Sequence, residues 1–270
     1  MNRPDLLTAM TLAALAACGP KEAPPPTETG VQTREITYQQ GTTPLKGFVA
    51  WDAGRTGPRP GVLIVHEWWG HNQHARNQAL RLAEAGYAGF ALDMFGDGKS
   101  TTHPDTAQAF MNHALSDIPV LMARFAAALA QLKADPNVDS TRIAAIGYCF
   151  GGAVVLSQAR AGADLDAVAS FHGAMPPGGP LDSGTVKARI LIMTGGADPM
   201  IPAAMVDSSA AALRKAGATV EVITYPGAQH SFTNPRADSV VGMKGFKYDA
   251  EADRQSWEAL LKLLREVWGT

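Results

Sequence analysis

Short apolar runs alternate along the chain with longer segments whose apolar residues recur at helical spacing. Continuous apolar runs are typical of strands covered on both faces, and they predict strands at 62–65, 87–92, 142–147, 167–171, 189–193 and 219–224. The helical spacing predicts helices at 73–85, 104–133, 150–160, 202–216 and 249–268. This alternation predicts an α/β fold, with a mostly parallel central sheet and helices on both faces.

Two segments before this alternation, 34–40 and 46–51, predict an antiparallel hairpin at the edge of the sheet. Gly86 is placed to cap the end of the first predicted helix. Pro119 predicts a kink or break inside the long helical segment 104–133. The pattern shows no internal repeat and no second domain boundary, so we expect residues 34–270 to form a single domain.

Composition narrows the function classes. The 270 residues are 46% hydrophobic and 18% charged, which suits one large α/β domain better than two small ones. The net charge of -2 gives no sign of the positive surface that binding to nucleic acid or to an anionic membrane requires. His71, His74, His103 and His113 have no metal-ligand spacing with acidic or cysteine partners, so we predict neither a metal nor a cofactor.

The N-terminal residues predict export. Arg3 precedes an apolar stretch at 6–17 that is shorter than the ~20 residues needed to span a bilayer, so residues 1–17 are interpreted as a signal peptide. Leu15-Ala16-Ala17-Cys18-Gly19 resembles the bacterial lipobox, which implies that Cys18 is lipidated and becomes the first mature residue. An ordinary secretory signal is the alternative. Residues 18–33, with three consecutive prolines, predict a disordered tether.

This interpretation places the protein in the cell envelope, facing the periplasm or the exterior, with the lipid as its only membrane contact. A soluble secreted or periplasmic protein is the alternative. Cys149 would then be the single free thiol in an oxidising compartment. A lone cysteine in that setting is better explained by chemistry than by a disulfide.

The surroundings of Cys149 are those of a nucleophile. A predicted strand ends in Gly147-Tyr148-Cys149-Phe150-Gly151 and turns directly into a predicted helix. A sharp strand-to-helix turn exposes a nucleophile and aims adjacent backbone N–H groups at developing negative charge. The alternative is a buried cysteine at a glycine-bounded strand end.

A thiol nucleophile needs a base, and the base needs a partner that fixes its tautomer. Chain order offers Cys149, then Asp198, then His230, each just past a predicted strand. Glu67 also follows a predicted strand, so the topology can bring all four to one rim of the sheet. His172 is the main rival of His230 as the base, and an Asp-Pro turn is the alternative role of Asp198.

These motifs resemble the dienelactone hydrolase family of α/β-hydrolases from about residue 34 to the end of the chain. Four segments carry the resemblance: His66-Glu67-Trp68-Trp69-Gly70, Gly147-Tyr148-Cys149-Phe150-Gly151-Gly152, Gly195-Gly196-Ala197-Asp198 and His230-Ser231-Phe232. The resemblance implies an α/β-hydrolase fold with Cys149 as nucleophile, His230 as base and Asp198 as its orienter. It further implies an oxyanion hole from the backbone N–H groups of Trp68 and Phe150, with Glu67 as an extra carboxylate beside the thiol.

The substrate is less well defined by the resemblance. Family members that cleave dienelactone hold its carboxylate with arginines, one in the loop and helix after the third long strand and one shortly after His-Ser-Phe. Here residues 101–113 contain no arginine or lysine, and Phe232 is followed by Thr233 and Asn234, with Arg236 a little further on. Trp69, Phe95 and Phe232 are predicted to line an apolar substrate pocket, with core packing as the alternative.

We therefore expect a hydrolase of small-molecule carboxylic esters or lactones that works through an acyl-thioester. A non-catalytic, lipid-anchored binding protein with a hydrolase fold is one alternative, and a thioesterase or peptidase is another.

Overall fold

The computed structural model describes residues 1, 30–176, 179, 181–239 and 243–269. The described strands are β1 (Val31–Gln40), β2 (Thr43–Asp52), β3 (Arg59–Val65), β4 (Ala88–Leu92), β5 (Val138–Tyr148), β6 (Ala167–Phe171), β7 (Arg189–Gly195) and β8 (Val220–Tyr225). The described α-helices are α1 (Gln73–Glu84), α2 (Pro104–Leu115), α3 (Ile118–Lys133), α4 (Phe150–Arg160), α5 (Ala203–Lys215) and α6 (Ala250–Trp268). A single 3-10 turn covers Ala237–Ser239.

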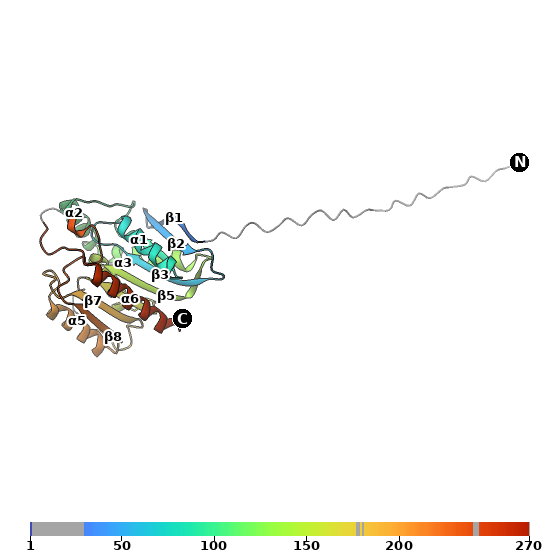
Figure 1. Ribbon diagram of the computed structural model, residues 1–270. Coiled ribbons are helices and arrows are strands. Elements are labelled where there is room, and N and C mark those ends of the chain that lie inside the picture. Colours follow the sequence, from blue (N-terminus) through green and yellow to red (C-terminus); the bar gives the residue numbers. More distant parts are fainter. Residues whose placement is uncertain (2–29, 177–178, 180, 240–242, 270) are drawn as a thin grey trace.

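The described strands form one 8-stranded sheet in the order β1-β2-β4-β3-β5-β6-β7-β8 (Figure 1). The strands from β4 to β8 in this order run parallel, whereas β2 is antiparallel to both β4 and β1. The strand order reverses at β3, which has β4 on one side and β5 on the other. Ligands of open α/β sheets bind outside the carboxyl ends of strands at such a reversal. The ends of β3 and β5 therefore flank the expected position of a site.

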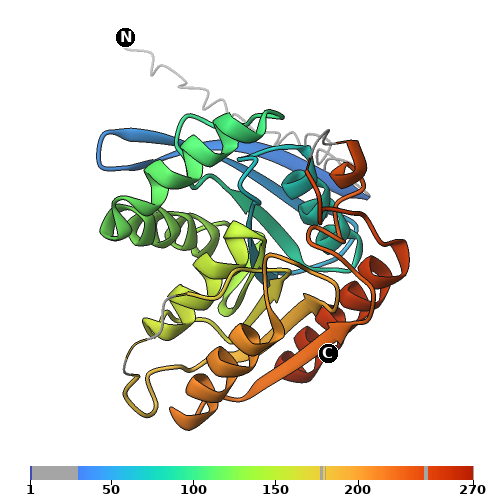
Figure 2. The ribbon, with the colours of Figure 1, turned by 90° about the vertical axis from the view of Figure 1, so that its left-hand side faces the viewer.

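Helices cover both faces of this sheet. Helices α1 and α6 pack on one face, where their apolar residues join Val62, Ile64 and Ile146 in a common cluster. Helices α3, α4 and α5 pack on the other face, where their apolar residues join Leu63 and Val65 in a second cluster. Figure 2 shows the two layers, with α1 (teal) and α6 (red) on one side and α4 and α5 (yellow-green to orange) on the other. Burial on both faces is the reason that the central strands are continuously apolar.

The fold predicted from the sequence is confirmed. The N-terminal hairpin is present, and β1 is the edge strand, paired antiparallel with β2. The predicted helix 104–133 is two helices that meet at a bend of 93°. The break falls at Ser116–Asp117, because Asp117 caps α3 through its contact with the Val120 N–H and Pro119 occupies the first turn of α3. Proline is tolerated there because first-turn N–H groups have no helical partner.

The predicted tether at 18–33 needs one correction. Residues Val31–Thr33 belong to β1 and pair with residues 50–52 of β2. The backbone hydrogen bonds of the hairpin extend the strand beyond the point at which the side-chain pattern stops predicting it. The predicted signal peptide, Cys18 and the rest of the tether lie outside the described residues, apart from Met1 and Gly30.

Among the described residues, no single helix has the length and apolar character needed to cross a membrane. Helices α2 and α3 reach that length and composition only as a bent pair.

Candidate active site

Cys149 occupies a sharp turn between β5 and α4. Its backbone has φ 54° and ψ -116°, a strained conformation that costs a non-glycine residue about 1–3 kcal/mol and persists only where the surrounding structure enforces it. The Cys149 N–H donates to the Phe171 carbonyl oxygen at 3.0 Å, which ties the turn to β6. Cys149 is also the N-cap of α4. The sulfur therefore lies at a helix end that stabilises negative charge.

Glycines make this turn possible through close backbone contacts. A Cβ atom on Gly147 would lie 2.1 Å from the Gly151 carbonyl oxygen, and one on Gly151 would lie 2.3 Å from the Val65 carbonyl oxygen. Real Cβ atoms do not approach that closely, so a larger residue at either position would displace backbone. The second contact also brings the end of β3 against the start of α4.

His230 and Asp198 form a buried pair. His230 Nδ1 lies 2.8 Å from Asp198 Oδ2, and both side chains are buried. The other carboxylate oxygen, Oδ1, accepts from the backbone N–H groups of Met200 at 2.8 Å and Ile201 at 3.1 Å. Because both oxygens are bound, the carboxylate has a fixed orientation. It holds the proton on Nδ1 and leaves Nε2 of His230 for chemistry.

The pKa of His230 connects this pair to Cys149. Burial opposes the charged imidazolium, but the negative charge of Cys149 and the Asp198 hydrogen bond outweigh it, as does a hydrogen bond between the His230 and Cys149 side chains. Together they raise the pKa of His230 to about 10. The raised pKa means that His230 favours its protonated form, next to the Cys149 side chain.

The backbone N–H groups of Trp68 and Phe150 donate no hydrogen bond to any described residue. Trp68 follows the end of β3, and Phe150 begins α4 next to Cys149. The contact between Gly151 and the Val65 carbonyl brings these two segments together. Two free donors beside a nucleophile are what an oxyanion hole requires.

Glu67 is buried, with its side chain directed at the loop that follows His230. Its Oε1 accepts from Ser231 Oγ at 2.9 Å, and its Oε2 accepts from Asn234 Nδ2 at 2.6 Å. The sequence predicted this carboxylate to lie beside the thiol, but its described hydrogen bonds are made to neutral donors of the 231–234 segment. Ser231 and Asn234 are site residues that the sequence reasoning missed. Ser231 stands in the His230-Ser231-Phe232 motif, whereas the only signal for Asn234 was its polar character close to that motif.

His172, the rival base, has a different partner. Its Nε2 lies 2.8 Å from Thr233 Oγ1, and its side chain is completely buried. Burial, and then the charge of His230, lower the pKa of His172 well below its ordinary value. Asp198 contacts His230 and not His172.

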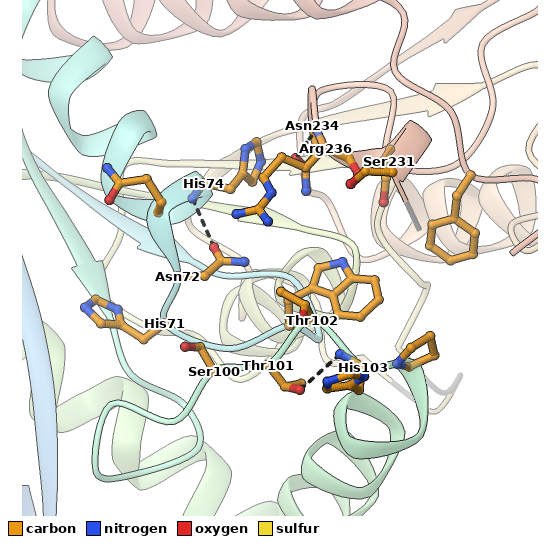
Figure 3. A pocket seen from close by; sticks show the side chains of 16 residues that line it. His71, Asn72, His74, Ser100, Thr101, Thr102, His103, Ser231, Asn234 and Arg236 are labelled. Atoms are coloured by element: carbon orange, nitrogen blue, oxygen red, sulfur yellow. Dashed lines mark hydrogen bonds between the residues drawn. The ribbon is translucent and has the colours of Figure 1, made fainter. Parts of the chain in front are cut away.

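A cavity of about 1090 Å³ lies beside these residues. Its inner wall includes Trp69, Ser231, Asn234 and Phe246, and its remaining walls come from 71–74, 100–104 and 236–239. Figure 3 shows Arg236 extending into the cavity from the loop after His230, opposite Thr102 and His103. Polar side chains share the lining with the aromatic rings of Trp69 and Phe246, so this cavity is mixed in character and not purely apolar.

The three predicted pocket aromatics have different surroundings. Trp69 lines the cavity. Phe95 is buried against His66 and Phe150, with ring centroids 4.7 and 5.4 Å away. Phe232 is completely buried, with its ring 5.4 Å from that of Tyr225. Ser231 adopts φ 58°, and this turn directs the next side chain into the core. Phe95 and Phe232 thus belong to the support of the site and not to the cavity wall.

The described part of the chain contains no group of three or more His, Cys, Asp or Glu side chains arranged to hold a metal ion. The groups that the site offers are a thiol, an oriented imidazole and two backbone N–H donors without a hydrogen-bond partner among the described residues.

Comparison with known proteins gives a consistent result. Residues 45–268 match the profile of the dienelactone hydrolase family. A protein of Methylorubrum extorquens named "Putative carboxymethylenebutenolidase" is 29% identical over 242 residues, covering 86% of this chain and 79% of the relative. Among solved structures, a dienelactone hydrolase-like promiscuous phosphotriesterase from metagenomic libraries superposes with a TM-score of 0.84 at 36% identity, covering 88% of this chain and 99% of that one. The protein m3DLH superposes equally well at 38% identity and the same coverage.

Proposed function

The chain belongs to the dienelactone hydrolase family of enzymes that act on ester and lactone bonds, and from this premise we propose that Cys149, His230 and Asp198 form its catalytic triad. The observation that carries the proposal is the coupling between them. Asp198 binds Nδ1 of His230, and the pKa of His230 is raised to about 10 by Cys149 and Asp198 against the effect of burial.

The reaction has two steps. Cys149 Sγ attacks the substrate carbonyl carbon, a C–S bond forms, and the carbonyl oxygen becomes an oxyanion that accepts from the N–H groups of Trp68 and Phe150. Collapse breaks the C–O bond of the ester, and His230 gives its proton to the leaving alkoxide. In the second step His230 takes a proton from water, which attacks the thioester. The C–S bond breaks, and the acid and the thiolate–imidazolium pair are released.

The test uses purified mature protein with small aryl esters and lactones. Cys149→Ala should abolish turnover, and Cys149→Ser should retain the fold with little activity. A pre-steady-state burst of the leaving alcohol or phenol with substrate in excess, together with a trapped acyl-enzyme, reports the thioester. Hydrolysis at equal rates by wild type and Cys149→Ala would exclude this mechanism. Failure of a thiol-reactive probe to label Cys149 faster than a denatured control would favour a binding protein.

A second candidate activity is the hydrolysis of phosphate triesters. It is favoured by the 36% identity to the solved phosphotriesterase over nearly the whole of that chain. Here Cys149 Sγ would attack phosphorus, forming an S–P bond as the bond to the leaving aryloxide breaks, and water would then cleave the S–P bond. Turnover of a dialkyl aryl phosphate that is lost in Cys149→Ala supports this activity. Its absence from a preparation that hydrolyses aryl esters excludes it.

Arg236 is the residue suited to a negatively charged substrate. Its exposed side chain lines the cavity, and the hydrogen bonds that Arg236 makes with described residues come from its backbone. We expect Arg236→Gln to raise KM for a lactone carboxylate by about 10- to 100-fold and to leave KM for a neutral aryl ester unchanged, since one lost charged hydrogen bond contributes about 1.5–3 kcal/mol. Arg254→Gln, on the exposed face of α6, is the matched control.

Export and lipid anchoring at Cys18 belong to the same proposal. They rest on the N-terminal sequence alone. Full-length protein expressed in a bacterial host should fractionate with membranes and should become extractable by buffer when Cys18 is replaced by Ser. Equal fractionation of the two would exclude the anchor.

A further inference from the structure

The ring of His230 is held by aromatic side chains as well as by Asp198. The His172 ring meets it at a centroid distance of 5.2 Å and an interplanar angle of 67°. Phe246 meets it at 4.9 Å and 73°. Both contacts are edge-to-face, which is a favoured geometry for aromatic rings. Phe246 lines the cavity and has an open side, whereas His172 is completely buried.

His172 is itself fixed at both its backbone and its side chain. Its N–H donates to the Met193 carbonyl of β7 at 2.7 Å, although its φ of 40° is unusual for a residue other than glycine. Its Nε2 lies 2.8 Å from Thr233 Oγ1, and Thr233 is also buried. A backbone position under strain, combined with a buried side-chain hydrogen bond, points to a selected orientation.

Thr233 belongs to the segment that carries the other polar groups of the site. It follows His230 by three residues and lies between Ser231 and Asn234, the two residues that bind Glu67. The bond from His172 thus joins the end of β6 to the loop on which His230 itself lies. The same imidazole contacts the His230 ring and anchors the chain that follows it.

We propose that His172 is a positioning residue, which through its ring contact with His230 and its hydrogen bond to Thr233 holds Nε2 of His230 at the Cys149 sulfur. This role rests on the proposed function of His230 as the base. It differs from the rival role in which His172 would itself take the proton, because His172 has Thr233 and not a carboxylate as its partner.

The electrostatics of the cluster suit this role. The groups that face His230 are Cys149, Asp198 and His172. The groups that face His172 are His230 and His74. Burial and then the two neighbouring histidines lower the pKa of His172, which therefore remains neutral while His230 is charged. A neutral ring packs against the imidazolium without repelling it. The Nδ1 atom of His172 has no hydrogen-bond partner among the described residues, so the Nε2 bond to Thr233 is the polar restraint on this ring.

The experiment separates the two contacts of His172 by four substitutions. Thr233→Val removes the hydroxyl at nearly constant shape, and Thr233→Ser retains it as the matched control. His172→Phe keeps a ring against His230 without a hydrogen-bonding group, and His172→Gln keeps a hydrogen-bonding group without the ring. Each variant is checked by its circular dichroism spectrum and thermal midpoint. Each is then assayed for kcat and KM on an aryl ester and for the pH dependence of Cys149 alkylation by iodoacetamide.

We expect Thr233→Val to lower kcat by about 10- to 100-fold with KM changed less than twofold, since a misplacement of a catalytic group by about 1 Å can cost about 100-fold. Thr233→Ser should stay within threefold of wild type. Both His172 variants should lower kcat by an amount between those of Thr233→Ser and Thr233→Val. The high-pH part of their Cys149 alkylation profile, where His230 loses its proton, should move to lower pH, because the imidazolium is held less well.

Two results would overturn the proposal. One is a kcat for Thr233→Val and His172→Phe within twofold of Thr233→Ser. The other is a fall in kcat with an unchanged alkylation profile, because a general loosening of the loop would not be specific to the thiolate–imidazolium pair. If Thr233→Val does not fold, the pair His172→Gln and His172→Phe provides the same comparison. Loss of the proposed function is a separate outcome, recognised by equal rates for wild type and Cys149→Ala.

Discussion

Replacement of Asp198 by asparagine should disable the site by reversing the His230 tautomer. Asp198 Oδ1 accepts from the N–H groups of Met200 and Ile201. In Asp198→Asn the amide oxygen must occupy that position, because an NH2 group there would face two donors. The amide NH2 is then directed at Nδ1 of His230. That nitrogen can no longer carry a proton, so the proton moves to Nε2, which faces Cys149.

The size of the effect follows from two losses. A histidine held in the wrong tautomer cannot accept a proton at Nε2, and an asparagine with unchanged geometry at this position of a serine-protease triad lowers kcat about 10⁴-fold. The Asp198 negative charge is also lost, so the pKa of His230 should fall below its value of about 10. We expect kcat to fall about 10³- to 10⁴-fold, or about 4–5.5 kcal/mol in activation free energy.

The assay is the steady-state hydrolysis of an aryl ester between about pH 6 and 10, accompanied by Cys149 alkylation at each pH. In Asp198→Asn the high-pH part of both profiles should move to lower pH, because the pKa of His230 falls. Asp207→Asn, on the exposed face of α5, controls for the loss of one carboxylate. If Asp198→Asn keeps more than a tenth of the wild-type kcat at neutral pH, the tautomer argument and the assignment of Asp198 as the orienter are both incorrect.

Three further predictions follow from the same contacts. Gly147→Ala should prevent folding or lower the unfolding free energy by more than 3 kcal/mol, because its Cβ would lie 2.1 Å from a backbone oxygen, whereas Gly179→Ala, with nothing within 4 Å of its Cβ, should be neutral in urea unfolding. Since the pKa of His230 is raised to about 10, its stabilising contribution is complete below about pH 6.5 and is lost as the pH rises from there through about 10. The wild-type thermal midpoint should therefore fall more steeply between about pH 6.5 and 10 than that of His230→Gln. Asn234→Leu removes a donor from the buried Glu67 carboxylate and should cost about 1–3 kcal/mol in urea unfolding; a cost below 0.5 kcal/mol would show that this hydrogen bond is not required.

The fold was largely predictable from the sequence because its central strands are covered on both faces. Burial on two faces gives a continuous apolar run, as in β3 and β6, and the predicted bounds of β6 and α4 agree with the structure to the residue. Boundaries set by backbone hydrogen bonds were less predictable. The first residues of β1 contain polar side chains, and only their pairing with β2 makes them a strand.

The site could be predicted only in part. Chain order and strand ends were sufficient to select Asp198 and His230, which the structure brings to 2.8 Å from each other. The direction of a side chain after a turn does not follow from the same pattern. Ser231 has a left-handed backbone, and this conformation directs Phe232 inward and lets Ser231 contact Glu67. Contacts across 164 residues of sequence, such as this one, have no local signal.

The strained backbone of Cys149 lowers the stability of the fold at the position that carries the thiol. Its strain belongs to position 149 and not to the sulfur, since the φ of 54° is imposed by the packing of β5 against α4. Cys149→Ser and Cys149→Ala retain that strain and so report on chemistry alone. Cys149→Gly removes the thiol and relieves the strain together, and we expect it to yield a protein without hydrolase activity that resists unfolding more than the wild type does. At position 149 the chain carries this strain for any residue that has a Cβ, and only glycine would remove it.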